Sequence, residues 1–300
     1  MKKKRSLSLY DFPYLLLTLA VFFWSGNFIV GRAVRADIPP IALAFWRWTC
    51  SSLLVFFLAR PHLKHDWKMV TRNWPILILL SIIGVASFNT LVYTGLHWTI
   101  ALNAFLMQSM MPVMILAMSF LIFREKITSV QATGVAFSLA GAFVIIVQGN
   151  IGVLLSLSLN QGDIFIFIAV ICYAGYSVML RKRPFIHPLS FLVVTFIIGS
   201  LILLPFYLWE TWTVRTISFN RSTFLAVGYV AIFPSIVSYF CFNRGVELIG
   251  ANRAGLFLHL MPVFGSIMAI VFLGESLKWF HGAGITLIAS GILLTTRVKN

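Results

Sequence analysis

Long uncharged runs of apolar residues alternate with short polar gaps along the whole chain. Each run has roughly the 20 residues that an α-helix needs to cross the hydrocarbon core of a bilayer. Because backbone N–H and C=O groups in lipid must be paired within the segment, these runs are expected to be helices. The pattern therefore predicts an all-α integral membrane protein with ten transmembrane helices. The predicted spans are residues 13–31, 41–59, 74–93, 102–123, 129–147, 162–180, 189–208, 223–243, 253–273 and 280–296.

Composition agrees with a membrane protein and excludes an ordinary soluble domain. Of the 300 residues, 60% are hydrophobic and 10% are charged, whereas about 25% are charged in a typical soluble domain. The net charge of +15 does not indicate nucleic-acid binding, because the Lys and Arg residues are dispersed between the apolar runs. Cys50, Cys172 and Cys241 lie in separate apolar runs, and their spacing predicts neither a disulfide nor a metal site.

Lys and Arg residues are distributed unevenly between the two sets of gaps. With the N-terminus placed in the cytoplasm, 17 of the 23 fall in cytoplasmic segments and five in outer gaps, while Arg47 lies inside a span. Positively charged residues favour the cytoplasmic side of a membrane protein. The asymmetry predicts a multi-pass protein of the cell (inner) membrane with both termini in the cytoplasm.

The chain contains an internal repeat with an offset of 150 residues. Residues 110–126, MMPVMILAMSFLIFREK, match residues 260–276, LMPVFGSIMAIVFLGES, in the Met-Pro-Val step and in a glutamate near the end. Eleven identities at this offset fall between residues 95 and 141, and upstream Trp24-Ser25-Gly26 pairs with Tyr173-Ala174-Gly175. The repeat predicts two five-helix units, residues 13–147 and 162–296.

The odd number of helices in each unit fixes their relative orientation. The second unit must enter the membrane from the opposite side, so the two units are predicted to be inverted repeats. Inverted repeats are a recurrent architecture of secondary transporters, which hold substrate near the midplane between the halves.

Several of these features together resemble the EamA family of the drug/metabolite transporter superfamily. They are the ten spans in two halves, the Phe45-Trp46-Arg47 step, the proline in the fourth and ninth spans, and the glutamate that closes each of those spans. The second half has the Phe-Leu-Gly-Glu form at residues 272–275, whereas the first half departs from it with Phe-Arg-Glu at 123–125. The resemblance implies a small-molecule carrier, usually an exporter, with a central cavity lined by spans 1, 3, 4, 6, 8 and 9. The family handles amino acids, other metabolites and some drugs.

The predicted function is therefore secondary transport, with export of small amphipathic metabolites such as amino acids by alternating access between the repeats. An intramembrane enzyme and a non-transporting membrane interaction protein are the alternatives. The chain has no His-Glu-x-x-His pattern and no Walker loop, so no catalytic residue, metal or cofactor is predicted. The expected partners are a small-molecule substrate and the lipid bilayer, and both a monomer and a homodimer remain open.

Polar side chains within the spans are the candidates for substrate binding, because a polar group in hydrocarbon needs a partner or a wet cavity. Hydrogen bonding between helices is the competing explanation for each of them. Asn89 corresponds to Tyr239 in the repeat, and Tyr93 corresponds to Asn243. The candidate substrate-binding residues are Trp24, Asn27, Asn89, Tyr93, Gln108, Ser109, Tyr176, Tyr239, Asn243 and His259.

Pro112 and Pro262 lie near the middle of their spans and are predicted to kink them beside the cavity. Arg47 is the one full charge well inside a span. A structural role is favoured for it over pairing with a substrate carboxylate. Glu125 and Glu275 are also expected to be structural. Each is predicted to cap the following helix or to pair with Arg124, Lys126 or Lys278.

All eight acidic residues lie at span ends or in gaps, so His259 is the one titratable candidate at depth. Either His259 carries proton coupling, or transport is uncoupled. A separate pattern of small residues occurs at Ala132, Ala136 and Ala140 and is matched by Gly282, Thr286 and Ser290. It predicts close packing between spans 5 and 10, and a homodimer seam is the alternative.

Overall fold

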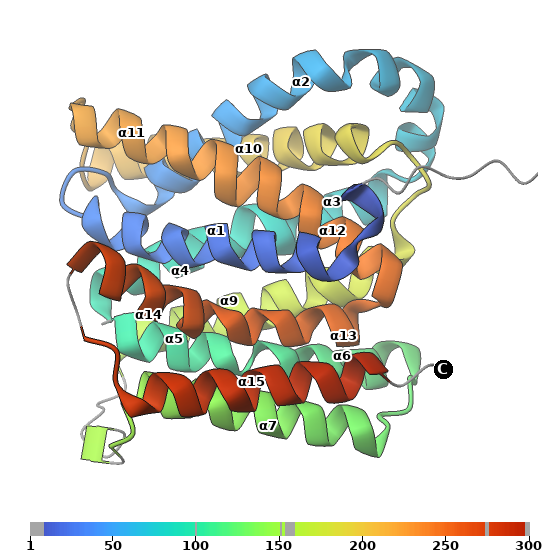
Figure 1. Ribbon diagram of the computed structural model, residues 1–300. Helices are drawn as coiled ribbons and strands as arrows, with labels where there is room; N and C mark the ends of the chain where they lie inside the picture. Colours follow the sequence, from blue (N-terminus) through green and yellow to red (C-terminus); the bar gives the residue numbers. More distant parts are fainter. Residues whose placement is uncertain (1–8, 100, 151, 154–159, 274–275, 298–300) are drawn as a thin grey trace, which may run out of the picture.

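The computed structural model describes residues 9–99, 101–150, 152–153, 160–273 and 276–297, and folds them into a bundle of roughly parallel and antiparallel helices (Figure 1). Within this part of the chain, nine helices are long and apolar enough to span a membrane. A tenth, interrupted span covers residues 251–273. The ten spans are α1 (Pro13–Ala33), α2 (Pro40–Arg72), α3–α4 (Trp74–Leu80 and Phe88–Trp98), α5–α6 (Ala101–Ser109 and Met111–Phe123), α7 (Ser129–Ile146), α9 (Gln161–Met179), α10 (Pro188–Thr213), α11–α12 (Arg221–Val230 and Ser238–Ile249), α13–α14 (Ala251–Leu256 and Leu260–Leu273) and α15 (Trp279–Arg297).

The two repeats run in opposite directions through the bundle. Helix α1 begins at the end of the bundle where α15 finishes, whereas its counterpart α9 begins at the other end (Figure 1). We call the end that holds the start of α1 and the finish of α15 the terminal end, and the other the opposite end. The protein is thus an integral membrane protein built from two inverted five-helix repeats.

Local sequence explains where the helices begin. Proline occupies the first turn of α1, α2 and α10, where its missing N–H costs no hydrogen bond. The Thr128 side chain caps α7 in a capping box with Gln131, and Asn160 caps α9 in the same way with Asp163.

Helix α2 is much longer than the predicted span of residues 41–59. It continues through Pro61 to Arg72 and projects beyond its neighbours at the terminal end (Figure 1). The prediction ended at Ala59 because Arg60 and the charged residues after it interrupt the apolar run. An exposed helix keeps its backbone hydrogen bonds in a charged sequence, so the end of the apolar run was not the end of the helix.

Helices α2 and α10 pack along each other, and a carboxylate on each helix caps the N-terminus of the other. The carboxylate of Glu210, at the end of α10, accepts hydrogen bonds from the backbone N–H groups of Ile41 at 3.1 Å and Ala42 at 2.7 Å, in the first turn of α2. Near the end of α2, the Asp66 carboxylate accepts from the N–H of His187, just before α10. Each helix therefore supplies an anion to the positive N-terminus of the other.

We expect Glu210→Ala to lower the free energy of unfolding by about 2–3 kcal/mol, because two charge-assisted hydrogen bonds at a buried helix terminus are lost. Chemical unfolding in detergent measures the change. Glu210→Gln retains one acceptor oxygen and should lose less. An alanine variant as stable as the wild type would show that water replaces the carboxylate at no cost.

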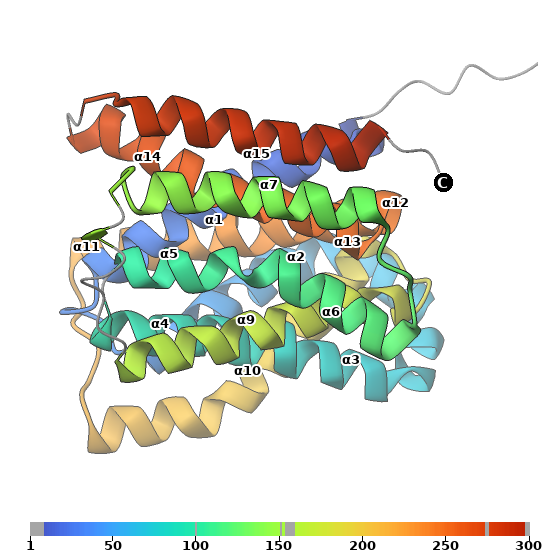
Figure 2. The ribbon, with the colours of Figure 1, turned by 90° about the horizontal axis from the view of Figure 1, so that it is seen from below.

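Helices α7 and α15 form the other long pair (Figures 1 and 2). Their contact runs through glycines, since a Cβ at Gly141 would lie 2.6 Å from the carbonyl oxygen of Gly284. The predicted stripe of Ala132, Ala136 and Ala140 is not the contact face. All three residues are exposed, as is Gly282. The two spans do pack on each other, but the face predicted for that packing was wrong.

Two π-helical segments occupy equivalent places in the repeats. They are η2 (Ser81–Ser87), between α3 and α4, and η4 (Ala231–Val237), between α11 and α12, and the offset is again 150 residues. Such widened turns displace backbone carbonyls from the regular α-helical pattern and often occur at functional sites. Both segments lie beside the polar centre of the bundle.

Candidate functional site

Arg47 is the centre of a buried polar cluster that joins the two repeats. Its side chain is fully buried. Nε donates to the Ser235 hydroxyl at 2.6 Å, across the repeat boundary. Nη1 lies 2.9 Å from Asn27 Oδ1, 2.8 Å from Asn89 Oδ1 and 2.8 Å from the Tyr93 hydroxyl. Three of the candidate substrate-binding residues therefore converge on one guanidinium group.

A tyrosine–asparagine hydrogen bond occurs once in each repeat, with the residue types exchanged. In the first repeat the Tyr93 hydroxyl on α4 donates to Asn27 Oδ1 on α1 at 2.7 Å. In the second repeat the Tyr176 hydroxyl on α9 donates to Asn243 Oδ1 on α12 at 2.9 Å. The first bond is reinforced by Arg47. The second has no such support, because the counterpart of Arg47 is Thr195, whose hydroxyl bonds to carbonyls of its own helix.

Tyr239 lies between the two tyrosine–asparagine pairs. It is fully buried, and its ring centroid is 5.8 Å from that of Tyr176, 5.8 Å from that of Trp24 and 5.2 Å from that of Trp48. Asn89 Nδ2 lies 3.4 Å from its hydroxyl oxygen. Asn243, Tyr176, Tyr239, Asn89 and Arg47 thus form a continuous chain of contacts through the bundle.

The π-helical segments supply matching carbonyls to this centre. The Tyr239 hydroxyl donates to the carbonyl oxygen of Gly84 in η2. The Trp24 indole N–H donates to the carbonyl oxygen of Pro234 in η4 at 2.8 Å. Gly84 and Pro234 are 150 residues apart, so each repeat offers the same backbone carbonyl to an aromatic side chain of the other repeat.

The two proline-containing spans are interrupted, and His259 connects them. Helix α5 ends at Ser109, and α6 restarts at Met111 with Pro112 in its first turn. In the second repeat, η5 (Phe257–His259) separates α13 from α14, which carries Pro262. His259 Nε2 donates to the Ser109 carbonyl oxygen at 2.9 Å, since a carbonyl only accepts. Because Ser109 and His259 are counterparts in the repeat, this bond joins the two breaks at the pseudosymmetry axis.

Several of the buried polar atoms without a partner lie in this region. Within the described part of the chain they include Nη2 of Arg47, Nδ2 of Asn243, both side-chain polar atoms of Gln108, and Nδ1 of His259. An unpaired buried donor or acceptor costs about 1–3 kcal/mol, and native structures contain few. Such atoms can form hydrogen bonds with a bound polar molecule.

A cavity of about 850 Å³ opens at the terminal end and leads inward to Asn243. We call it the vestibule. Its wall is formed by the ends of α6, α9 and α12, the start of α13, and the segment between α9 and α10. Beyond Asn243 the bundle is packed closely, and the void beside Trp24, Asn27 and Tyr173 measures only about 10 Å³.

At the opposite end, a second polar network joins α9 to the first repeat. Asp163, at the start of α9, is buried and accepts from the Thr99 hydroxyl at 2.5 Å and from Asn103 Nδ2 at 3.0 Å, both in the first repeat. Arg32 Nη1 donates to the Thr99 carbonyl oxygen at 3.0 Å. Beneath this network Gly95 and Gly162 bring α4 and α9 into backbone contact. This contact closes the opposite end between α4 and α9. Two cavities of about 510 and 420 Å³ lie elsewhere at that end, one beside Pro262 on α14 and one beside Arg32 on α1.

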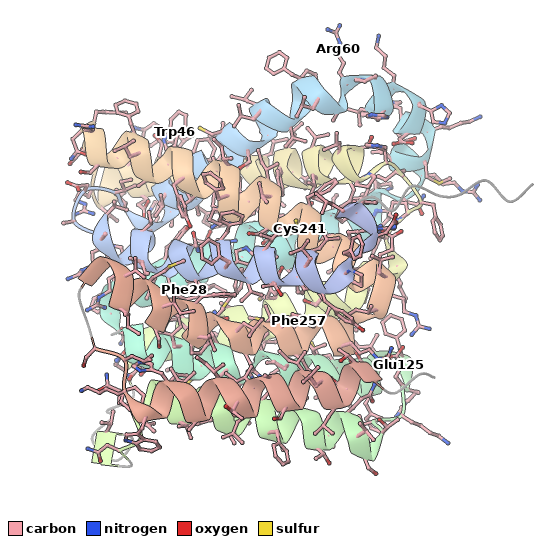
Figure 3. All side chains as sticks on the ribbon, viewed as in Figure 1. Phe28, Trp46, Arg60, Glu125, Cys241 and Phe257 are labelled. Carbon is pink, nitrogen blue, oxygen red and sulfur yellow. The ribbon has the colours of Figure 1, made fainter. Side chains whose placement is uncertain are left out.

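Glu125 lies at the terminal end (Figure 3) and has partners other than the expected ones. Its carboxylate pairs with Arg181 and accepts a hydrogen bond from Asn252 Nδ2 at 3.1 Å. Thr128, not Glu125, caps the following helix. Because both partners belong to the second repeat, Glu125 connects the repeats at the mouth of the vestibule. Glu275 lies outside the described residues.

The structure brings most of the predicted site residues together at the centre of the bundle. Trp24, Asn27, Asn89, Tyr93, Tyr176, Tyr239 and Asn243 belong to the contacts around Arg47 and Tyr239, whereas Ser109 and His259 form the neighbouring bridge. Gln108 is buried beside that bridge.

Sequence reasoning missed Ser235, Asp163 and Trp48. Ser235 was passed over because serine is common in membrane helices, although its neighbour Pro234 marks a disturbed turn. Asp163 was treated as lying outside the packed interior because it is at a span end. In the described part of the chain, no group of three His, Cys, Asp or Glu side chains is placed to hold a metal ion.

Comparison with known proteins supports a transporter. The model of the EamA-like transporter family matches residues 11–147 and 160–297. The chain is 28% identical to the uncharacterized transporter YyaM of Bacillus subtilis, over 95% of this chain and 93% of that protein. It is 25% identical to an uncharacterized transporter of Archaeoglobus fulgidus, over 94% and 96% of the two chains. A crystal structure with 16% identity superimposes with a TM-score of 0.77 over 95% of this chain and 96% of that chain, which shows a shared fold.

Proposed function

Because the chain belongs to the EamA-like transporter family, we propose that it carries small metabolites across the cell membrane by alternating access between its two repeats. The observation that carries this proposal is the vestibule, which is open at the terminal end, ends at Asn243 and is separated from the opposite end by the closely packed polar centre. A carrier needs such a closed barrier on one side of a central polar site.

The charge distribution supports placing the terminal end in the cytoplasm. The gaps at that end hold most of the Lys and Arg residues, including Arg60, which points away from the bundle (Figure 3). With this orientation the vestibule would face the cytoplasm, the side from which an exporter would take up its substrate.

We further propose that substrate binds where several unpaired polar atoms lie, between Asn243 and Arg47. Trp24, Tyr176 and Tyr239 would then contact the apolar part of the substrate, and the amide and guanidinium groups would contact its polar part. Tyr239 lies between the vestibule and Arg47 in the chain of contacts, so it would have to move before substrate reaches the centre.

Counterflow in liposomes tests transport directly. Purified protein is loaded with an unlabelled metabolite, and accumulation of the labelled form is measured for a broad panel of anions, zwitterions and cations. We expect accumulation of at least one class, and its loss when Tyr239 is replaced by alanine. Arg60→Gln, an exposed change outside the site, is the matched control and should transport normally. A folded wild-type protein that accumulates none of the panel would contradict the proposal.

His259 provides a separate test of proton coupling. Its Nε2–H bridges the two interrupted spans, and a glutamine amide can donate to the same carbonyl without titrating. We expect His259→Gln to keep more than about half of the transport rate and its response to a pH gradient, whereas His259→Leu, which loses the bridge, should fall by about tenfold, the usual scale for one lost buried hydrogen bond. Loss of the pH response in the glutamine variant alone would instead assign coupling to His259.

A further inference from the structure

We propose that the transported substrate is an organic anion and that Arg47 binds its carboxylate. The inference rests on the proposed transport function and names the substrate class of the same site. It follows from the partners of Arg47, from the charge of the vestibule and from the position of the buried acids.

Among the residues that the structure describes, Arg47 has no anionic partner. Its hydrogen-bond partners, Ser235, Asn27, Asn89 and Tyr93, are all neutral. The ion pairs among the described residues involve Arg181, Arg183 and Arg244 and do not include Arg47. The guanidinium group remains charged in a protein. At the centre of the bundle, the described partners of this fully buried positive charge are therefore dipoles and not anions.

One nitrogen of the Arg47 guanidinium group also has no hydrogen-bond acceptor among the described residues. Nε and Nη1 are satisfied, but Nη2 is buried without a partner. Its two N–H groups are the kind of donor that binds a carboxylate in a short, charge-assisted contact. Trp48 covers the guanidinium carbon at 4.7 Å, which holds the group in place but supplies no negative charge.

An unbalanced buried charge is costly. Removing a charge from water without a counter-ion costs several kcal/mol in a protein interior, and ionisable groups at membrane depth commonly mark the path of a substrate. A bound anion would supply the missing counter-charge. A neutral or cationic substrate would leave Arg47 uncompensated, and a cation would add repulsion.

The vestibule would attract the same class of molecule. Its wall carries Lys126, Arg181, Arg183, Arg244 and Arg253 against Glu125 and Glu247. A cleft lined mainly by one sign of charge concentrates molecules of the other sign. At its inner end Asn243 presents an unpaired Nδ2 donor. From there Tyr176, Tyr239 and Asn89 lead to Arg47.

The buried acids argue against a zwitterionic substrate. Asp163 and Glu210 are buried carboxylates, but both lie at the opposite end and are occupied by hydrogen bonds to Thr99 and Asn103, and to the first turn of α2. In the described part of the chain, no carboxylate is in contact with the cluster around Arg47 that would bind the ammonium group of an amino acid. We therefore infer a carboxylate without an ammonium group, attached to an apolar body that fits against Trp24 and Tyr239.

Three probes with one aromatic ring and different charges test the inference. They are phenylpyruvate (anion), phenylalanine (zwitterion) and phenethylamine (cation). Counterflow of each is measured in liposomes with the full-length wild type, alongside three further aliphatic members of each charge class. We expect at least one anion to be transported about tenfold faster than any zwitterion or cation. Faster transport of a zwitterion or a cation would overturn the inference and leave the transport function intact, whereas no transport of any probe would contradict the transport function itself.

Variants at Arg47 separate binding from packing. We expect Arg47→Gln to lower anion transport by at least about tenfold, the scale for losing one partner of a buried charged contact. Arg47→Lys keeps the charge and should retain more transport than the glutamine variant. Arg60→Gln is the arginine control outside the site. A folded Arg47→Gln protein with wild-type anion transport would overturn the inference.

If the Arg47 variants do not fold, the inference can be tested by measuring how ligands change the melting temperature of the wild-type protein. The transported anion should raise the melting temperature in detergent, and its uncharged amide should not. Equal stabilisation by the acid and the amide would overturn the inference, because it would show that the carboxylate makes no specific contact.

Discussion

Replacing Gly162 by alanine should loosen the contact between α4 and α9 at the opposite end of the protein. A Cβ at this position would lie 2.5 Å from the carbonyl oxygen of Gly95 and 2.7 Å from the backbone N of Thr99. Backbone atoms of α4 cannot rotate away as a side chain can, so α4 and α9 would have to separate. Overpacking of this kind costs about 1–3 kcal/mol, and the cost applies only while the end is closed.

The expected result is about a tenfold faster reaction of a cysteine introduced at Phe28 with a water-soluble thiol reagent, since 1.4 kcal/mol changes a two-state equilibrium tenfold. Phe28 is buried and lies toward the opposite end (Figure 3). Cys50, Cys172 and Cys241 are replaced by alanine beforehand, to remove their own reaction with the reagent. Gly228→Ala is the control, because a Cβ there meets nothing within 4 Å. Unchanged labelling in Gly162→Ala would show that contact between α4 and α9 does not hold this end closed.

Replacing Gly141 by alanine should destabilise the whole protein more than any exposed change. A Cβ there would lie 2.6 Å from the carbonyl oxygen of Gly284 and 2.9 Å from the backbone N of Ile288 on α15. Helices α7 and α15 would be forced apart along their contact, and we expect a loss of about 2–3 kcal/mol. The melting temperature in detergent, followed by the helical signal, measures the effect.

The neighbouring residue provides the control and tests the alternative raised by the sequence. Ala140 is exposed on the outer surface of α7, so Ala140→Leu should leave the melting temperature unchanged in a monomer. If the small-residue stripe were a homodimer seam, the leucine would shift the protein to a smaller species in light scattering. Normal stability in Gly141→Ala would contradict the glycine contact.

The positions of the spans and their inverted arrangement were predictable from the sequence, because hydrophobic length and an odd-numbered repeat depend on few assumptions. The Met-Pro-Val step at residues 111–113 and 261–263 also marked both interrupted spans. The π-helical segment Ser81–Ser87 was not predictable, since it contains no proline and does not break the apolar run. In Ala231–Val237, Pro234 indicates a disturbed turn but not its π-helical form.

Specific contacts were harder to predict than the residues that make them. The alignment of the repeats shows that asparagine and tyrosine change places between them: Asn27 and Tyr93 in the first repeat correspond to Tyr176 and Asn243 in the second. To predict the hydrogen bonds themselves, one must also know how far each helix is shifted along its axis relative to its neighbours. The prediction that the alanine stripe forms the contact face of α7 was wrong for a related reason. Small residues every fourth position mark a face of a helix, yet Gly134 and Gly141 mark another face of α7, and only the shape of the partner helix decides between them.

The unequal reinforcement of the two tyrosine–asparagine pairs has an energetic consequence. Arg47 reinforces the pair in the first repeat, and Thr195 gives the second no comparable support. If the protein alternates as proposed, its inward-open and outward-open forms would therefore differ in free energy. Without substrate, the form with its vestibule open to one side of the membrane would be the more populated. This preference would determine from which side of the membrane substrate binds first. It cannot drive the accumulation of substrate, because it changes the forward and return rates of transport by the same factor.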